Sequence, residues 1–195
     1  MKISRFMALA LGGLFILTGT TAVSAADLQK EFFGFEWGAP VGDYPELKRL
    51  YAKDKIAFYT APSRAYSVDD VPISRVVYGF ADDKLFAIYM DIDSVESFNH
   101  LKNYIQDKYG DPKQSYSAKE RQLVLKWKKG AIRLKLKNRE TDQKMKLALY
   151  YSPISRTLNE VNVDNHQEQS IPVSYTHLRA HETNDLISYA VFCLK

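Results

Sequence analysis

The stretch that decides the fold is residues 123–136, LVLKWKKGAIRLKL. Apolar and basic residues alternate on both sides of Lys129-Gly130, and an alternation of period two is typical of a half-buried β-strand. The Lys-Gly pair supplies a tight turn between the two alternating runs. We therefore predict a two-stranded antiparallel ribbon, apolar on one face and basic on the other.

The same period recurs elsewhere in the chain and predicts further strands. The run 145–151 repeats the pattern with Met145, Leu147, Leu149 and Tyr151 as its apolar members. Two more runs flank the polar segment 81–84, which is typical of a hairpin turn. The additional strands are expected at 56–59, 76–80, 85–92 and 145–151.

Two segments predict helices instead. The first covers 95–109, where Asp93 is a candidate N-cap with Glu96 three residues later, and Gly110 and Pro112 end the helix. Its apolar face consists of Val95, Phe98, Leu101, Ile105 and Tyr109.

The second predicted helix begins at Asp43, with Pro45 and Glu46 in its first turn. It would bury Leu47, Leu50 and Tyr51.

These elements predict an α+β fold. We expect an antiparallel sheet of about five or six strands with two main helices on one face. Because each predicted helix precedes three predicted strands, the order of elements allows two helix-plus-three-strand repeats. Residues 26–158 would form this single domain, followed by a polar tail over 159–171.

The N-terminus has the pattern of an export signal. A cationic start over 1–5 precedes an apolar run from Phe6 to Leu17, and small residues lead to Ala25. The alternative, an anchoring helix, needs roughly 20 apolar residues, but threonines interrupt this run earlier. We predict a signal peptide over 1–25, cleaved after Ala25 or Ala26, and a periplasmic protein without a transmembrane span after processing.

The C-terminus reads as translated sequencing adapter. Back-translation of 173–183 (VSYTHLRAHET) gives a transposase adapter, and 187–194 (ISYAVFCL) gives the flow-cell end of the same library design. We therefore treat 172–195 as non-native and assign no role to Cys193 or to His177 and His181. Without Cys193 the native part has no cysteine for redox or thiolate chemistry.

Charge is unevenly distributed along the domain. The balance is −5 over 26–112 and +7 over 113–171, whereas the whole chain carries +4. If the apolar residues of the later strands point inward, the basic ones share the opposite face. This face is the candidate binding site and comprises Lys126, Lys128, Arg133, Lys135, Lys137, Lys144 and Lys146.

The basic face has two readings. It either binds an anionic partner, such as anionic lipid headgroups or an acidic protein, or is a solvated surface that prevents edge-to-edge aggregation. Nucleic acid is not expected, because the compartment is wrong and Tyr150 is the only aromatic interleaved with these cations.

No catalytic or metal motif stands out. The acidic groups Asp69-Asp70, Asp82-Asp83 and Asp91-x-Asp93 lack the spacing of a calcium loop, and no nucleophile elbow, phosphate loop or HExxH occurs. His100 sits at the edge of the apolar helix face, and His166 lies in the polar tail. We predict no cofactor and no metal.

The aromatic run 32–38 (FFGFEWG) is either an edge strand that contributes to the core or a ligand-stacking platform. Together with Tyr78-Gly79-Phe80 and Tyr109-Gly110-x-Pro112, its Phe35-x-Trp37-Gly38 motif resembles small uncharacterised exported proteins of Gram-negative bacteria, over residues 32–152. The resemblance implies an envelope location and carries no catalytic residues.

The sequence thus favours a non-catalytic periplasmic binding or interaction module that uses its basic face. Two alternatives stay open: a hydrolase with a carboxylate pair that the sequence does not identify, and an inhibitor-like protein of a secreted enzyme.

Overall fold

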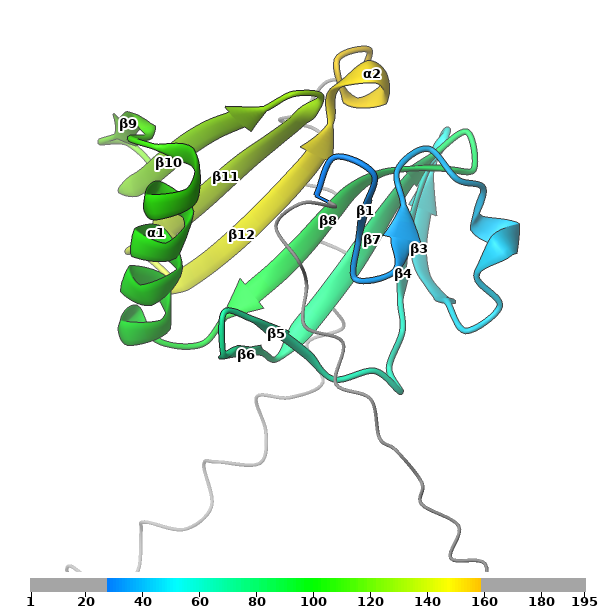
Figure 1. Cartoon of the computed structure of the whole chain (residues 1–195), viewed down its shortest axis with the longest axis horizontal. Coiled ribbons are helices and arrows are strands. Elements are labelled where there is room, and N and C mark those ends of the chain that lie inside the picture. The colour runs from blue at the N-terminus through cyan, green and yellow to red at the C-terminus, as the bar shows by residue number, and fades with distance from the viewer. Residues whose placement is uncertain (1–27, 159–195) are drawn as a thin grey trace, which may run out of the picture.

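The computed structural model describes residues 28–158, which form a mostly β domain around one large sheet (Figure 1). The predicted signal peptide, the polar tail and the adapter-like residues lie outside the described residues. The sheet has eight antiparallel strands in the order β3-β4-β7-β8-β12-β11-β10-β9. Their bounds are Lys48–Lys53 (β3), Ile56–Thr60 (β4), Arg75–Ala81 (β7), Lys84–Ile92 (β8), Lys113–Ser117 (β9), Gln122–Lys129 (β10), Ile132–Arg139 (β11) and Lys144–Tyr151 (β12).

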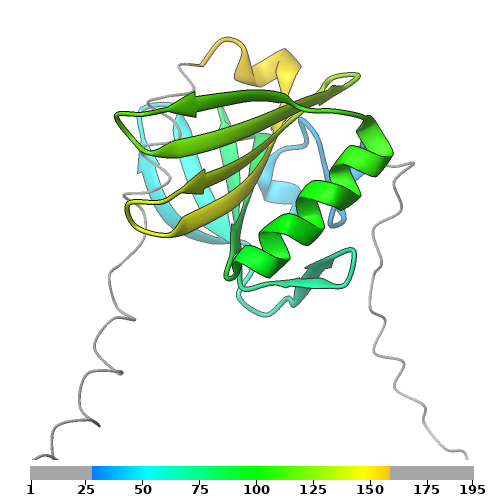
Figure 2. The ribbon, with the colours of Figure 1, turned by 90° about the vertical axis from the view of Figure 1, so that its left-hand side faces the viewer.

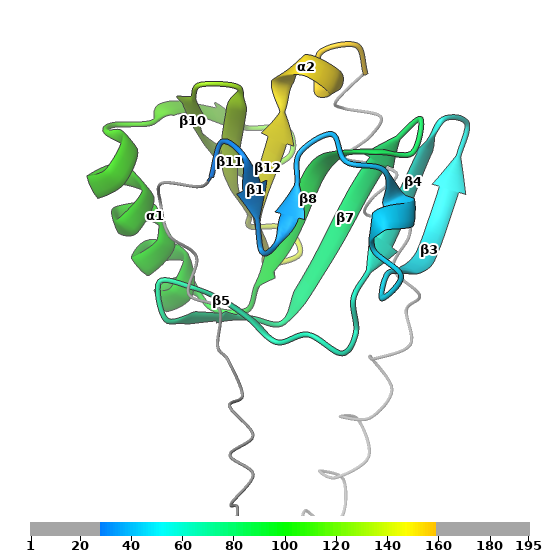
Figure 3. The same ribbon diagram turned by 45° about the vertical axis from the view of Figure 1, so that its right-hand side comes forward.

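The remaining elements are short, apart from one helix. Helix α1 lies across one face of the sheet, which we call the inner face, and two small hairpins border the same side (Figure 3). Their bounds are Val95–Tyr109 (α1), Glu31–Phe32 (β1), Phe35–Glu36 (β2), Tyr66–Val68 (β5), Val71–Ile73 (β6), the 3-10 turn Val41–Asp43 (η1) and the one-turn helix Ser152–Ser155 (α2).

The prediction of an α+β fold with five or six strands and two main helices is wrong. The described chain has eight strands in the main sheet and a single long helix. Where the second helix was expected, a 3-10 turn is followed by β3. The helix-plus-three-strand repeat therefore fails as well, because within residues 28–158 a 3-10 turn, not an α-helix, precedes β3.

The apolar spacing that suggested this helix has another cause. Leu47 packs against the inner core, whereas Leu50 and Tyr51 pack against the opposite face of the sheet. A register shift between Arg49 and Tyr51 in the pairing of β3 with β4 marks a bulge. Because a bulge lets consecutive side chains share one face, the spacing of a helix arises here from an irregular strand.

The strands predicted from alternation are confirmed at β4, β7, β8, β10, β11 and β12. The turn between β7 and β8 consists of Asp82 and Asp83, both with positive φ (46° and 62°), as a two-residue hairpin requires. The β10–β11 turn contains Gly130 with φ 57°. The sheet is two four-stranded meanders whose last strands, β8 and β12, pair with each other.

Helix α1 is confirmed, although its cap is one residue later than predicted. Ser94, not Asp93, is the N-cap, and its Oγ accepts a hydrogen bond from the Ser97 amide at 3.0 Å. Asp93 instead accepts a hydrogen bond from Ser74 Oγ at 2.8 Å. Gly110 ends the helix with φ 80°.

The main core lies between α1 and the inner face of the sheet. Phe98, Leu101 and Ile105 of α1 are buried against the inward residues of β10–β12. A second apolar cluster lies on the outer face, the side opposite α1, and includes Phe58, Val77, Tyr89 and Tyr150. Burial on both faces explains why β8 and β12 read as nearly continuous apolar runs.

The aromatic run 32–38 belongs to the core. It is not one edge strand: it turns at Phe33 and Gly34, both with positive φ, so that β1 pairs with β2. Phe35 is fully buried and Trp37 is 7% exposed, with its Nε1 donating to the Leu28 carbonyl oxygen at 2.9 Å. These rings are packed into the core and do not form an exposed aromatic platform.

Candidate functional site

The seven predicted site residues lie on the outer face of β10, β11 and β12. Strand alternation puts them opposite the buried leucines, and the register sets like charges against each other. The directly opposed pairs are Lys126–Lys135, Lys128–Arg133 and Lys137–Lys146. We call this surface the cationic face and define it as Lys126, Lys128, Arg133, Lys135, Lys137, Lys144 and Lys146.

Sequence reasoning missed two cations that extend the cationic face. Arg139 opposes Lys144, and it simply continues the alternation of 133, 135 and 137 by one more step. Lys113 opposes Lys126 from β9, a strand whose sequence KQSYS lacks the apolar alternation that would have revealed it. Lys113, Lys126 and Lys135 therefore form one row across three neighbouring strands.

One cation of the face is buried and paired. Lys146 is 7% exposed, and its Nζ lies 3.9 Å from Asp91 Oδ1 on the adjacent strand β8. Burial raises the pKa of the Asp91 carboxyl, and the Lys146 ammonium opposes this rise. Asp91 thus forms an ion pair with a lysine of the neighbouring strand.

A carboxylate in the β11–β12 turn binds two further cations. Asp142 accepts two hydrogen bonds from Arg139, at 2.9 Å from Nε and 2.8 Å from an Nη, and lies 3.2 Å from Lys144 Nζ. The bonds from Arg139 are the main cause that lowers the Asp142 pKa to about 2. This end of the cationic face is therefore partly neutralised.

Toward the middle of the sheet, two cations of the cationic face lie beside an aromatic ring. The Lys135 ammonium lies 4.7 Å and the Arg133 guanidinium 6.0 Å from the centroid of the buried Tyr150 ring, within range of cation–π attraction. Arg133 also donates to Ser155 Oγ at 2.8 Å. Arg133, Lys135, Lys137, Arg139 and Lys146 all have interaction partners.

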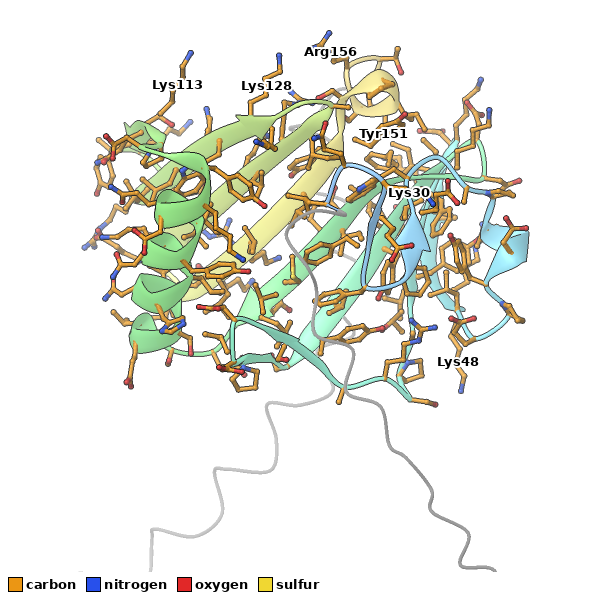
Figure 4. All side chains as sticks on the ribbon, viewed as in Figure 1. Lys30, Lys48, Lys113, Lys128, Tyr151 and Arg156 are labelled. Atoms are coloured by element: carbon orange, nitrogen blue, oxygen red, sulfur yellow. The ribbon has the colours of Figure 1, made fainter. Side chains whose placement is uncertain are left out.

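Accessible charge is concentrated toward the β9–β10 edge. Lys126 and Lys128 are exposed, as is Lys113. Figure 4 shows Lys113 and Lys128 extending from the same edge of the molecule, far from Lys48 on β3.

The acidic pairs Asp69-Asp70 and Asp82-Asp83 lie in hairpin turns. Asp69 and Asp70 form the β5–β6 turn, where Asp69 Oδ2 lies 2.9 Å from His100 Nε2. Asp82 lies 3.6 Å from Lys55 Nζ. Within residues 28–158, no group of three or more His, Cys, Asp or Glu side chains could hold a metal ion. His166 lies outside the described residues.

Comparisons of the chain with protein-family models, with curated proteins and with solved structures found no match. In the described part of the chain, neither helix has the length and apolar character needed to cross a bilayer.

Proposed function

We propose that the protein is a non-catalytic, exported binding module whose cationic face binds an acidic segment of a partner protein in the periplasm. The observation that carries the proposal is the group of three exposed lysines, Lys113, Lys126 and Lys128, on the adjacent strands β9 and β10, where Lys113 and Lys126 are directly opposed. Neighbouring strands are about 4.8 Å apart, and like charges at this spacing repel each other. Carboxylates of a partner would relieve that repulsion.

A polypeptide fits this face better than a lipid bilayer does. Among the described residues, the exposed large apolar side chains are Val95 and Tyr116, and neither is on the cationic face. Lipids would therefore be held by charge alone. The sheet is also strongly twisted (Figure 2), so a flat bilayer would reach only part of the face, whereas a flexible chain can follow it.

The test is fluorescence anisotropy with a labelled peptide in which glutamate alternates with serine. The purified protein should bind it more weakly as salt rises, because exposed charges are screened. Lys126→Glu with Lys128→Glu should weaken binding roughly tenfold or more, because two exposed attractive charges become repulsive. The matched control, Lys48→Glu with Lys53→Glu on β3, makes the same change in net charge and should alter the dissociation constant less than twofold.

A second experiment tests lipid vesicles as the alternative binding partner. Phosphatidylcholine vesicles with and without phosphatidylglycerol are co-sedimented with the same proteins. Stronger binding to anionic vesicles than to the peptide would overturn the choice of partner. Equal weakening by both double variants would show that only net charge matters and would refute the cationic face as a site.

A further inference from the structure

A cavity of about 260 Å³ lies on the inner side of the sheet, away from the cationic face. Its floor is Leu134, Leu147 and Leu149, of which Leu134 and Leu149 are directly opposed across β11 and β12. Ile105 of α1, Val68 of the β5–β6 hairpin and Phe32 of β1 complete the apolar walls. These residues come from segments that are distant in sequence, and Figure 3 shows that α1, β1 and the β5–β6 hairpin lie on the same side of the sheet.

The mouth of the cavity is polar. Asp69, Asp70, Tyr104 and Lys108 also line the cavity, and of these Asp69, Asp70 and Lys108 are exposed, so the buried apolar lining is joined to charged groups on the solvent side. This combination is characteristic of small-molecule sites, and the volume of about 260 Å³ lies just below their usual range of ~300–1,000 Å³. A ligand must therefore be slender and have a single apolar chain or ring.

The charges at the mouth determine which head group fits. Lys108 donates a hydrogen bond to the Tyr104 hydroxyl and lies 3.9 Å from the centroid of that ring, so its ammonium is held along α1. Asp69 is paired with His100 at 2.9 Å. Asp70 makes no hydrogen bond or ion pair with any residue between 28 and 158, and its carboxylate remains available at the rim.

We propose that this cavity binds an amphiphile with one short alkyl chain and a cationic ammonium head, the chain lying on Leu134 and Leu149 and the head beside Asp70. Burial of the chain supplies the affinity, because apolar surface is removed from water. Because Asp69 is paired with His100 and the Lys108 ammonium is held on Tyr104, the Asp70 carboxylate supplies the preference for a cation over an anion.

The probes are octylamine, octanol and octanoate, which share one chain and differ in the head group. Isothermal titration calorimetry on the purified protein should give saturable binding of one octylamine. Octylamine should bind roughly three- to fivefold more tightly than octanol, the range of an exposed ion pair, and octanoate should bind most weakly.

A matched pair of substitutions tests the head group. Asp70→Asn should remove the preference for octylamine over octanol. Asp83→Asn is the control: Asp83 is exposed and has a φ of 62° in the β7–β8 turn, close to the 63° of Asp70 in the β5–β6 turn. Asn accepts this backbone region as well as Asp does. An equal effect of the two substitutions, or none from Asp70→Asn, would overturn the cationic head.

A filling substitution tests the cavity itself. Val68→Phe places a ring in the cavity and should abolish binding of all three probes, while circular dichroism verifies that the variant is folded. Octylamine-induced chemical-shift changes at the Leu134 and Leu149 methyl groups give a readout that needs no variant. Binding that leaves both methyl signals unmoved would overturn the assignment. The acidic peptide serves as the reference, because its binding to the opposite face should be the same in every variant.

Discussion

Lys146 on β12 lies 3.9 Å from Asp91 on β8, and this ion pair spans the two strands that join the halves of the sheet. The lysine is almost completely buried, and the carboxyl is half-buried beside it. A charge at such a position is tolerated because its partner is present, so the pair is a sensitive point for stability.

We expect Lys146→Met to destabilise the protein by about 1–3 kcal/mol at pH 7, since it leaves the Asp91 carboxylate without its nearest cation. Burial already raises the Asp91 pKa, and loss of Lys146 raises it further. A raised carboxyl pKa means that ionisation opposes folding, so the deficit should shrink as pH falls toward 4. Urea unfolding at pH 7 and pH 4 measures it. The double variant with Asp91→Asn is the control and should recover stability at pH 7; a deficit independent of pH would contradict this account.

The turn carboxylate Asp142 should show the opposite pH dependence. Its pKa is lowered to about 2, first by the hydrogen bonds from Arg139, so the stability it contributes is fully present above about pH 4. It should be lost as pH falls from 4 through 2. Because the pair is solvent-accessible, Asp142→Asn should cost only about 0.5–1 kcal/mol at pH 7 and clearly less at pH 2, where the carboxyl is about half protonated. Urea titrations of both proteins across this range provide the test, and a constant difference would refute it.

A single hydrogen bond connects β10 to the end of α1. Trp127 Nε1 donates to the Gly110 carbonyl oxygen at 2.8 Å. Trp127→Phe keeps an aromatic ring but removes the donor, and we expect a loss of about 1–2 kcal/mol. Amide hydrogen exchange should increase most in the last turn of α1. The comparison is Trp37→Phe, whose lost bond goes to Leu28; increased exchange in α1 for that variant would contradict the local role of Trp127.

The residues beyond Leu158 should influence the cationic face. Leu158 packs against the outer apolar cluster, and Glu160, Asp164 and Glu168 follow it in the sequence. A tethered anionic segment competes at high effective concentration with an anion in solution. A chain ending at residue 158 should therefore bind the glutamate peptide several-fold more tightly than one ending at 171.

Two further variants of the protein distinguish the effect of the tail's charge from the effect of its length. Removal of 172–195 alone should leave peptide affinity unchanged. Conversion of the three carboxylates to amides in the chain ending at 171 should reproduce the effect of the shorter truncation. If the chain ending at 158 binds the peptide more tightly but the amide variant of the chain ending at 171 does not, competition by charge is contradicted.

The strands and the long helix could be predicted because their residues repeat a local period. Leu134 and Leu136 alternate with cations, and Phe98, Leu101 and Ile105 recur at helical spacing, so each segment indicates its own structure. The segment with Leu47, Leu50 and Tyr51 misled this reasoning, because a bulge and a change of face imitate helical spacing. Period alone cannot detect that a strand bends.

The shared face of the lysines followed from alternation, but their partners did not. Asp91 and Lys146 are 55 positions apart in the sequence, and only the pairing of β8 with β12 makes them neighbours. The cavity could not be predicted for the same reason, since its floor and walls come from five separate regions of the chain. Contacts across such separations depend on topology, which local patterns do not specify.

The pairing of β8 with β12 also determines how the polypeptide can assemble. Each meander can form from hairpins between consecutive strands, but closing the sheet must bring together two strands separated by α1 and three further strands. Until β8 and β12 pair, each has an exposed, largely apolar strand edge that can associate with other chains. In the folded protein β8 and β12 cover each other's edges. The edge strands of the sheet are then β3 and β9, both of which carry lysine.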